Sequence, residues 1–185
     1  MKIFNSLTIS KKYKGSAIAI GNFDGVHRGH QKVFKQAKKF AKKNKIRFGI
    51  LTFTPLPVMF FNKQDSNYRL TSEDQKFNIL KKYEVDFLVN IKFNKTFSKI
   101  SAKKFIKNIL YKKINPKLIF VSNNFKFGNK RKGNVNLLKK FSKKYDYKLL
   151  KINPFRDQGK IISSTGIRKC LQTGNLDLAN QLLSR

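Results

Sequence analysis

The chain has 185 residues, 40% of them apolar, so it can form one globular domain with a substantial core. Its apolar runs are too short to span a membrane, no signal-peptide core opens it, and its single cysteine excludes an internal disulfide. We therefore expect a cytoplasmic protein. The formal net charge of +33 attracts polyanions, but lysines are scattered through every segment and no motif that recognises nucleic acid is present, which favours compositional bias.

The first predicted core strand, Ser16 to Ile20, leads into a glycine-rich turn with the sequence GNFDGVHRGH at 21–30, and Gln31 to Lys43 is predicted to be a helix. Glycines let the backbone turn tightly, and the start of a helix offers free N–H groups to an anion. Both histidines of the chain, His27 and His30, fall in this turn. There they can donate hydrogen bonds to the oxygens of a phosphoryl or nucleotidyl group during transfer. The turn therefore predicts a phosphate site.

Two other interpretations of the turn are weaker. The histidines could be incidental, but their place between a strand and a helix favours a functional role. A zinc site needs more ligands, and only Cys170, far along the chain, could add one. Asp24 is the one acidic residue of the turn, so neither paired-carboxylate catalysis nor a Mg²⁺ site made of protein ligands alone is indicated. Mg²⁺ is expected to arrive on phosphates.

A second strand is predicted over Arg47 to Phe53, and the order strand, helix, strand indicates a parallel βαβ unit. The segment FTPLPVMFF at 53–61 then breaks the pattern, because its prolines stiffen the chain and argue against a helix. Its aromatic residues can form a flat apolar wall, although a packed surface loop is the simpler interpretation of these residues alone. Residues 1–15 are polar and basic and are expected to form an edge strand or a lead-in.

The alternation of strands and helices continues to the end of the chain. Ser72 and Gln75 predict a capping box at the start of the next helix. The expected elements are, in order, a helix to about Lys82, strand Asp86 to Ile91, a helix from Ser101 to about Tyr111, strand Lys117 to Val121, helix Val135 to Lys144, strand Tyr147 to Ile152, and a last helix after Gly174. This order predicts an α/β fold with a doubly wound, mostly parallel five-stranded sheet, in which ligands bind at the carboxyl ends of strands near the switch point.

Two later loops have the composition of ligand-binding segments. Residues 122–134, SNNFKFGNKRKGN, are basic and glycine-containing, which suits an anion or an aromatic ring, although a solvated basic loop has the same composition. Residues 161–168, IISSTGIR, end an extended run and start a helix. There hydroxyl and free N–H groups favour phosphate, and Arg168 can reach the same phosphate with its planar guanidinium. A plain helix cap and a surface cation are the simpler alternatives.

Together these segments resemble the bacterial FAD synthetase family, the FMN adenylyltransferase half of bifunctional riboflavin kinase/FAD synthetases. The turn at 21–30 matches the family signature, and its HxGH core is shared with a wider nucleotidyltransferase superfamily. Residues 53–61 match the pattern FxPxPxxxF, and residues 163–168 match SSTxIR. In the loop after the fourth predicted strand, Ser122 stands where the family usually has glycine and Lys126 where arginine is common, which bears on the path of that loop.

The resemblance implies that the chain makes FAD and pyrophosphate from ATP and FMN, with the FMN phosphate attacking the α-phosphorus of ATP in line. It implies catalytic roles for His27, His30 and Arg168. The residues implied in ATP binding are Gly21, Phe23, Asp24, His27, Gly29, His30, Ser164, Thr165 and Arg168. The flavin-side residues are Phe53, Pro55, Pro57, Phe61 and Asn124. No metal ligand of the protein is implied, and Mg²⁺ would be carried by the ATP phosphates.

The resemblance covers the FMN adenylyltransferase module, residues 1–185, and none of the family's riboflavin kinase module, so no kinase activity is expected. The expected partners are the small-molecule substrates, with no specific nucleic acid and no membrane. Two alternatives stay open: an adenylyl- or cytidylyltransferase for another phosphate acceptor, and a basic nucleic-acid-binding protein with a vestigial site. The loops at 53–61 and around Asn124 argue against the first alternative.

Overall fold

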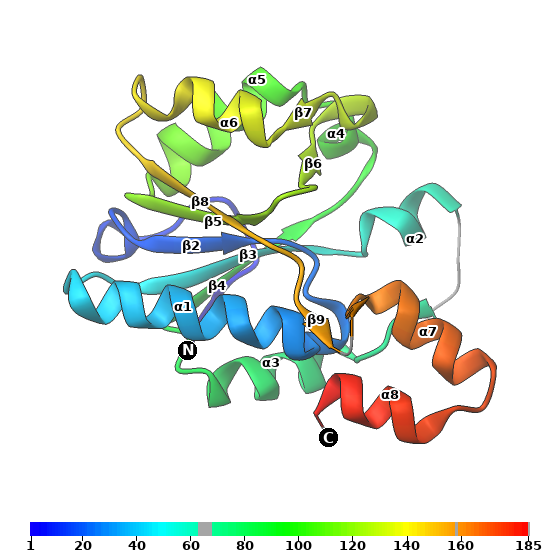
Figure 1. The fold of residues 1–185 in the computed structure, drawn as a ribbon. Coiled ribbons are helices and arrows are strands. Elements are labelled where there is room, and N and C mark those ends of the chain that lie inside the picture. The colour runs from blue at the N-terminus through cyan, green and yellow to red at the C-terminus, as the bar shows by residue number, and fades with distance from the viewer. Residues whose placement is uncertain (63–67, 158, 185) are drawn as a thin grey trace.

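Six parallel strands form the central sheet of the protein (Figure 1). The computed structural model describes residues 1–62, 68–157 and 159–184. In sequence order the strands are β1 (Lys2–Phe4), β2 (Ala17–Ile20), β3 (Phe48–Thr54), β4 (Phe87–Lys92), β5 (Leu118–Ser122) and β8 (Lys148–Ile152). Their spatial order is β1-β4-β3-β2-β5-β8, and every neighbouring pair is parallel. The predicted α/β class and parallel sheet are confirmed.

The predicted count of five strands is one short, because the N-terminal segment adds β1 at the edge of the sheet. This strand has three residues and pairs with β4, with Lys2 opposite Phe87. The edge-strand expectation for residues 1–15 is therefore confirmed. A strand of this length is too short to show the alternation of polar and apolar residues that identifies a strand in a sequence. Its pairing depends on the neighbouring strand.

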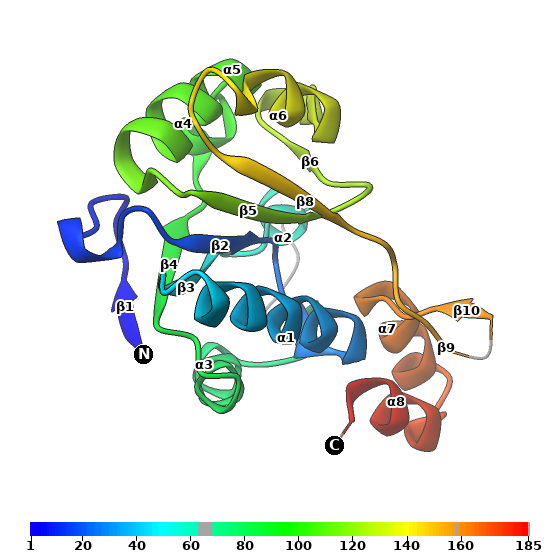
Figure 2. The ribbon, with the colours of Figure 1, turned by 60° about the vertical axis from the view of Figure 1, so that its left-hand side comes forward.

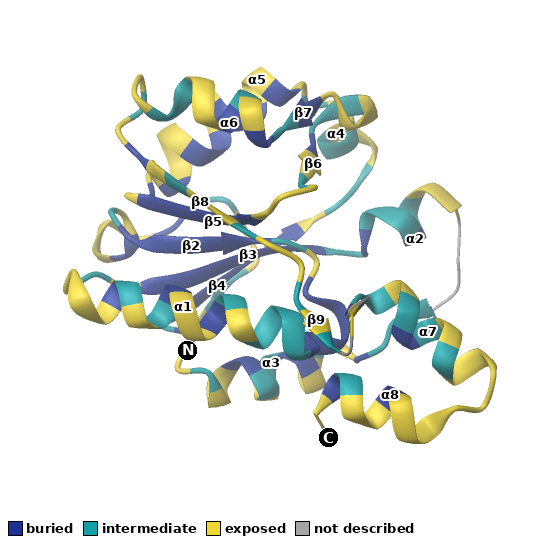
Figure 3. Cartoon of the chain, in the orientation of Figure 1, coloured by how far each residue is buried: buried dark blue, intermediate teal, exposed yellow. Residues whose placement is uncertain are grey.

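Helices cover both faces of the sheet (Figures 1 and 2). On one face lie α1 (Arg28–Lys43) and α3 (Glu73–Lys82), and on the other lie α5 (Ala102–Lys104), the π-helical stretch η4 (Phe105–Ile114) and α6 (Val135–Ser142). Each face has its own buried apolar cluster, one around Phe34 and Phe48 and the other around Ile106 and Leu110. Figure 3 shows the central strands between these clusters largely buried. This packing holds the strands, and with them the loops at their carboxyl ends.

The smaller elements connect these layers or lie beyond the carboxyl ends of the strands (Figure 1). They are the 3-10 turns η1 (Lys11–Tyr13), η2 (Asp24–Val26) and η5 (Asn129–Arg131), the helices α2 (Pro57–Asn62), α4 (Lys95–Ser98), α7 (Ser164–Gln172) and α8 (Leu176–Leu183), and the antiparallel pairs β6 (Lys126–Phe127) with β7 (Gly133–Asn134) and β9 (Arg156–Asp157) with β10 (Lys160–Ile161). Within the described residues, no helix combines the length and apolarity needed to cross a bilayer.

The prediction that residues 53–61 contain no helix is wrong, because α2 begins at Pro57. A proline lacks the N–H that the first turn of a helix leaves unpaired in any case, and its fixed φ suits that position. The second proline of the segment therefore starts a helix instead of preventing one. The predicted capping box of α3 is confirmed: Gln75 N donates to Ser72 Oγ at 3.1 Å, and Ser72 N donates to Gln75 Oε1 at 2.9 Å.

The order of the strands reverses at β2. From β2 the chain proceeds outward through β3 and β4, and it then returns to the other side of β2 to form β5 and β8. The loops that leave β2 and β5 therefore diverge, which opens a crevice at the carboxyl ends of these strands. The turn at 21–30 follows β2, and the segment 122–134 follows β5. Both predicted ligand loops therefore border the switch point.

Candidate active site

The turn after β2 follows an unusual backbone path. Gly21 N donates to Leu51 O at 3.1 Å, which keeps the turn beside the end of β3. Phe23 has a φ angle of 49° and Gly25 one of 78°, both in the left-handed region. Glycine adopts this conformation at no steric cost, and a Cβ on Gly25 would lie only 2.8 Å from Leu70 Cδ1. The predicted tight turn is confirmed.

The two histidines lie side by side at the start of α1. Their rings are nearly parallel, with an angle of 20° between planes and 3.6 Å between centroids. His27 is the N-cap residue of α1 and is 5% exposed. The His30 ring makes an edge contact with Phe23, 5.2 Å between centroids. The Nδ1 atoms of both rings are buried without a hydrogen-bond partner among the described residues, so each ring has a nitrogen that can still form a hydrogen bond.

Burial keeps both imidazole rings neutral near pH 7. It lowers the pKa of His27 from 6.5 to about 4. Burial also holds the pKa of His30 well below its ordinary value, and the charges of His27 and Lys76 lower it further. A neutral imidazole has one N–H donor, so each ring can donate a hydrogen bond to a phosphate oxygen without carrying charge.

This burial predicts that the folded protein loses stability in acid. As the pH falls from 6.5 toward 4, the unfolded chain protonates His27 before the folded chain does, so stability that is complete above pH 6.5 is progressively lost. The loss should reach about 3 kcal/mol for this residue. Thermal unfolding at several pH values in this window, on the wild type and on His27→Gln, measures it. The variant should lose less stability, and equal losses would contradict a neutral, buried His27.

Asp24 and Arg168, 144 residues apart in the chain, form an ion pair between a buried carboxylate and a partly buried guanidinium, in which Arg168 Nη2 donates to Asp24 Oδ2. Arg168 Nε also donates to Tyr68 O at 2.8 Å, and the guanidinium lies 3.9 Å from the centroid of the Tyr68 ring. The Asp24 carboxylate, which is 3% exposed, accepts a further hydrogen bond from Leu70 N at 3.1 Å. Both side chains are thus occupied by contacts within the protein.

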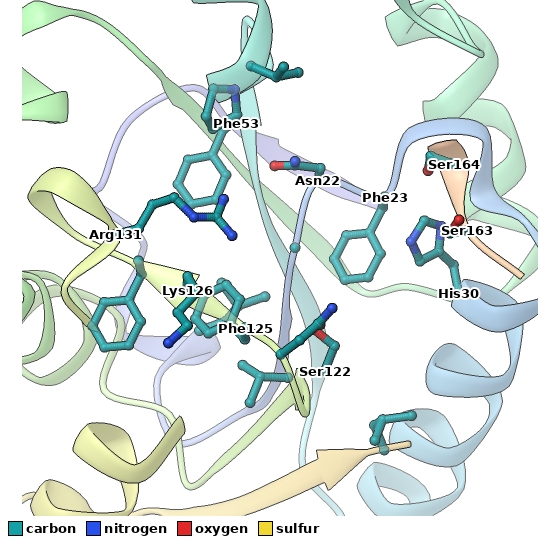
Figure 4. Close-up of a pocket in the computed structure, with 18 of the residues that line it drawn as sticks. Asn22, Phe23, His30, Phe53, Ser122, Phe125, Lys126, Arg131, Ser163 and Ser164 are labelled. Carbon is teal, nitrogen blue, oxygen red and sulfur yellow. The ribbon is translucent and has the colours of Figure 1, made fainter. Parts of the chain in front are cut away.

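The start of α7 is joined to the same turn. Ser164 Oγ donates to Asp24 O at 2.9 Å. Ser163 caps the helix, because its Oγ accepts from Gly166 N at 3.1 Å. Figure 4 shows Ser163 and Ser164 close to His30, so the starts of α1 and α7 meet at one place. Two helix starts direct free N–H groups and the positive ends of their dipoles to this place, which favours an anion there.

A pocket of about 840 Å³ separates the histidines from the loops that leave β3, β4 and β5. In Figure 4, Phe53, Phe125 and Arg131 lie across the pocket from His30. The aromatic side chains of this far wall pack around Phe93, whose ring centroid lies 6.1 Å from that of Phe53. A pocket of this volume is within the range of cofactor and nucleotide sites.

The far wall is also basic. Lys126, Lys130 and Arg131 line the pocket from the loop that joins β5 to β7. This loop is fixed against α5, because Gly128 has a φ of 72° and a Cβ there would lie 2.6 Å from Ala102 N. The pocket therefore places cations and aromatic rings on one side and neutral histidines with two helix starts on the other.

Comparison with known proteins agrees with this arrangement. The sequence model of the FAD synthetase family matches residues 9–166. The chain belongs to the FAD synthetase family. Two relatives, both described as bifunctional riboflavin kinase/FMN adenylyltransferases, extend the match. The protein of Buchnera aphidicola subsp. Schizaphis graminum is 44% identical over 187 residues, which cover 100% of this chain and 60% of the relative. That of Escherichia coli K12 is 33% identical over 170 residues, which cover 92% of this chain and 54% of the relative.

The chain thus spans about 60% or less of the length of these curated relatives. A solved structure, described as a macrolide-efflux protein from Streptococcus pneumoniae, has the same fold. It superimposes with a TM-score of 0.84 at 25% sequence identity, covering 98% of this chain and 59% of that chain. The family membership and the fold therefore both extend over nearly all of the present residues.

The pocket brings together most of the residues that the resemblance to FAD synthetases implied. Its lining includes Gly21, Phe23, His27, Gly29, His30, Ser164, Phe53, Pro57, Phe61 and Asn124. Four other implied residues, Asp24, Pro55, Thr165 and Arg168, are not part of the described lining. Thr165 is exposed, and Asp24 and Arg168 bind each other. The direct contacts of these four residues with ATP or flavin stay predictions.

Residues that sequence reasoning missed also line the FAD synthetase pocket. Phe93 and Phe97 complete the aromatic wall, with 5.6 Å between their centroids. Phe93 directly follows β4, just as Phe53 lies at the end of β3. The carboxyl ends of adjacent parallel strands share one edge of the sheet, so aromatic residues at both ends were the available signal.

Ser122, which replaces the family's usual glycine, fits its position without strain. It ends β5 in register with Ile152 and is not among the described residues with a positive φ. Its Oγ donates to Asn124 Oδ1 at 2.8 Å. Because the backbone there is extended, a side chain has room and no left-handed conformation is required. The loop after β5 therefore accommodates this departure from the family pattern.

No group of three or more His, Cys, Asp or Glu side chains that could hold a metal ion occurs in the part of the chain that the structure describes. The zinc alternative would have required such a group around His27 and His30. The acid of the turn, Asp24, is already paired with Arg168. The expectation that Mg²⁺ arrives on ATP phosphates stays a prediction.

Proposed function

We propose that this member of the FAD synthetase family is an FMN adenylyltransferase, which transfers AMP from ATP to FMN and releases pyrophosphate. The observation that carries the proposal is the pocket. On one side lies a stacked pair of neutral histidines, where the starts of α1 and α7 meet, and on the other side lies an aromatic wall. The histidines and helix starts suit the phosphates of both substrates. The aromatic wall suits a planar flavin ring.

The proposed reaction needs no covalent intermediate with the protein. A phosphate oxygen of FMN forms a bond to the α-phosphorus of ATP, and the bond from that phosphorus to the bridging oxygen breaks as pyrophosphate leaves. Negative charge develops on the oxygens of the transferred group and the leaving group, so positioning and charge stabilisation supply the catalysis. His27, His30 and the first N–H groups of α7 would donate to those oxygens. Mg²⁺ is proposed to enter with the ATP phosphates and to neutralise part of their charge.

The flavin is assigned to the side of the pocket lined by Phe53, Pro57 and Phe61. Phe61 is 64% exposed, which is unusual for so large an apolar side chain, and its ring packs against Phe93 with 5.8 Å between centroids. A planar ring system stacked here would cover exposed aromatic surface, which favours binding through burial of apolar area. Asn124, near the beginning of the loop after β5, is the proposed polar contact to the flavin.

An assay of the purified chain tests the proposed function. Supplied with Mg²⁺, ATP and FMN, the 185-residue chain should form FAD. Supplied with riboflavin in place of FMN, it should form neither FMN nor FAD, because the family model that residues 9–166 match is that of FAD synthetase. Chromatography of the flavins measures both reactions. FMN made from riboflavin would show that a kinase site lies within these residues.

The same assay separates the alternatives. A folded chain that binds ATP but makes no FAD from FMN would point to another phosphate acceptor, and a preference for CTP over ATP would point to a cytidylyltransferase. For the nucleic-acid alternative, binding to duplex DNA or RNA should collapse as salt rises if the charge of +33 acts only through phosphates. A riboflavin kinase module as partner and a cytoplasmic location remain parts of the proposal.

A further inference from the structure

A buried ammonium lies beside the turn, outside the described lining of the pocket. Lys76 lies on α3 and is 2% exposed. Its Nζ donates to Asn22 O, in the turn itself, at 3.3 Å. A buried ammonium costs stability unless its surroundings compensate it.

Lys76 has charged neighbours of both signs. Burial is the main effect and lowers the pKa of Lys76 from 10.5 to about 8. The carboxylates of Asp24 and Glu73 raise this pKa, and the guanidinium of Arg69 lowers it. The last two also bind each other, since Arg69 Nη1 donates to Glu73 Oε1 at 2.9 Å. Near pH 7 the ammonium is thus mostly charged, and about half of the molecules have lost this proton near pH 8.

The carbonyl that Lys76 holds controls the direction of a peptide in the pocket wall. Asn22 O also accepts from Thr52 Oγ1 at 3.0 Å, so two side chains fix it. The peptide between Asn22 and Phe23 is not among the cis bonds of the described chain, and in a trans peptide the C=O and the next N–H point in opposite directions. Phe23 N–H therefore points away from Lys76. Asn22 and Phe23 both line the pocket, and Figure 4 shows them between its two walls.

We propose that Lys76 is a positioning residue for nucleotidyl transfer: its ammonium holds Asn22 O so that Phe23 N–H is directed at the substrate phosphates. The inference rests on the proposed function and extends it to a residue that contacts neither substrate. The ammonium acts on the same turn that carries the histidines, and its charge also disfavours protonation of His30. One buried cation thereby orients a backbone donor and adds to the burial that keeps a side-chain donor neutral.

A purely structural role makes the opposite prediction. If Lys76 only filled space, a methionine of similar length would serve as well, because replacing a buried ion with an apolar side chain is often neutral or stabilising. The test compares Lys76→Met, Lys76→Arg and, as a matched control on the same helix, Lys81→Met, whose side chain is exposed. Lys76→Met should lower kcat for FAD formation by about 10-fold or more. Lys76→Arg should restore most of it, and Lys81→Met should equal the wild type.

The pH profile gives a readout that packing alone would not move. The wild-type kcat should fall as pH rises through about 8, because the neutral amine that forms there keeps N–H donors but loses the charge that strengthens its hydrogen bond to Asn22 O. Lys76→Arg keeps its charge, so its rate should stay level over this range. The charged and titratable groups that face Lys76 are Asp24, Glu73, Arg69 and His30. These neighbours and the substrate phosphates are unchanged in Lys76→Arg, so this variant separates their titration from that of the lysine.

Affinity for a non-hydrolysable ATP analogue, measured by titration calorimetry, separates this inference from the proposed function. If the wild type makes no FAD but Lys76→Met binds the analogue more weakly than the wild type, the function is wrong and the positioning role stands. Wild-type kcat and affinity in Lys76→Met, or an identical alkaline limb in Lys76→Arg, would overturn the inference. If Lys76→Met does not fold, the profiles of the wild type and Lys76→Arg decide alone.

Discussion

Replacement of His30 by alanine should lower the rate of FAD formation at saturating ATP and FMN by about 10²-fold or more. Loss of one fixed donor to developing negative charge has this effect where the donor is preorganised and shielded from water. The His30 ring is held in place, because it is stacked on His27 with 3.6 Å between centroids and makes an edge contact with Phe23, and its Nδ1 atom is buried. Chromatographic measurement of FAD under steady-state conditions gives the rate.

The fold of this variant should survive, because His30 belongs to neither of the two large apolar clusters that hold the sheet between its helices. Circular dichroism and a thermal unfolding curve check this point. His30→Gln is the matched control, since its amide can still donate a hydrogen bond and should preserve part of the rate. Turnover close to the wild-type rate in a folded His30→Ala protein would remove this residue from the catalytic mechanism.

Replacement of Arg168 by alanine should destabilise the protein by about 3–5 kcal/mol, because it leaves a buried carboxylate without its cation. That carboxylate is Asp24, which is 3% exposed and lies 144 residues away in the chain. The change also removes the hydrogen bond from Arg168 Nε to Tyr68 O, at 2.8 Å, and the packing over the Tyr68 ring. For a chain of this size the midpoint of thermal unfolding should fall by about 10 °C.

Two further proteins make this result specific to the ion pair. Arg156→Ala removes an exposed guanidinium whose Nη1 donates to Gly159 O, and its unfolding midpoint should stay close to that of the wild type. The double variant Asp24→Asn/Arg168→Met removes both charges and should lose less stability than Arg168→Ala. A wild-type midpoint in Arg168→Ala, together with weakened ATP affinity, would instead support the direct phosphate contact that the family resemblance implies for Arg168.

Short-range chemistry in the sequence was sufficient for most of the elements that form this site. The local sequence predicts the strand, glycine-rich turn and helix at 16–43, the Ser72 capping box and the start of α7 near Ser163. Each depends on residues within a few positions of one another, through apolar periodicity, left-handed backbone at glycine or a side-chain cap. The same local reasoning failed at Pro57, where a proline starts a helix, because stiffness alone does not distinguish a loop from a first helical turn.

The amino-acid sequence by itself therefore determined the family, the parallel α/β plan and the histidine turn, because all three are written in local patterns. Only the tertiary structure decided which side chains reach the pocket. It pairs Asp24 with Arg168 beneath the turn, places Phe93 in the aromatic wall and buries Lys76 against Asn22 O. These contacts join residues that are far apart in the chain, so they depend on strand order, the switch point at β2 and the packing of whole helices, none of which a local pattern encodes.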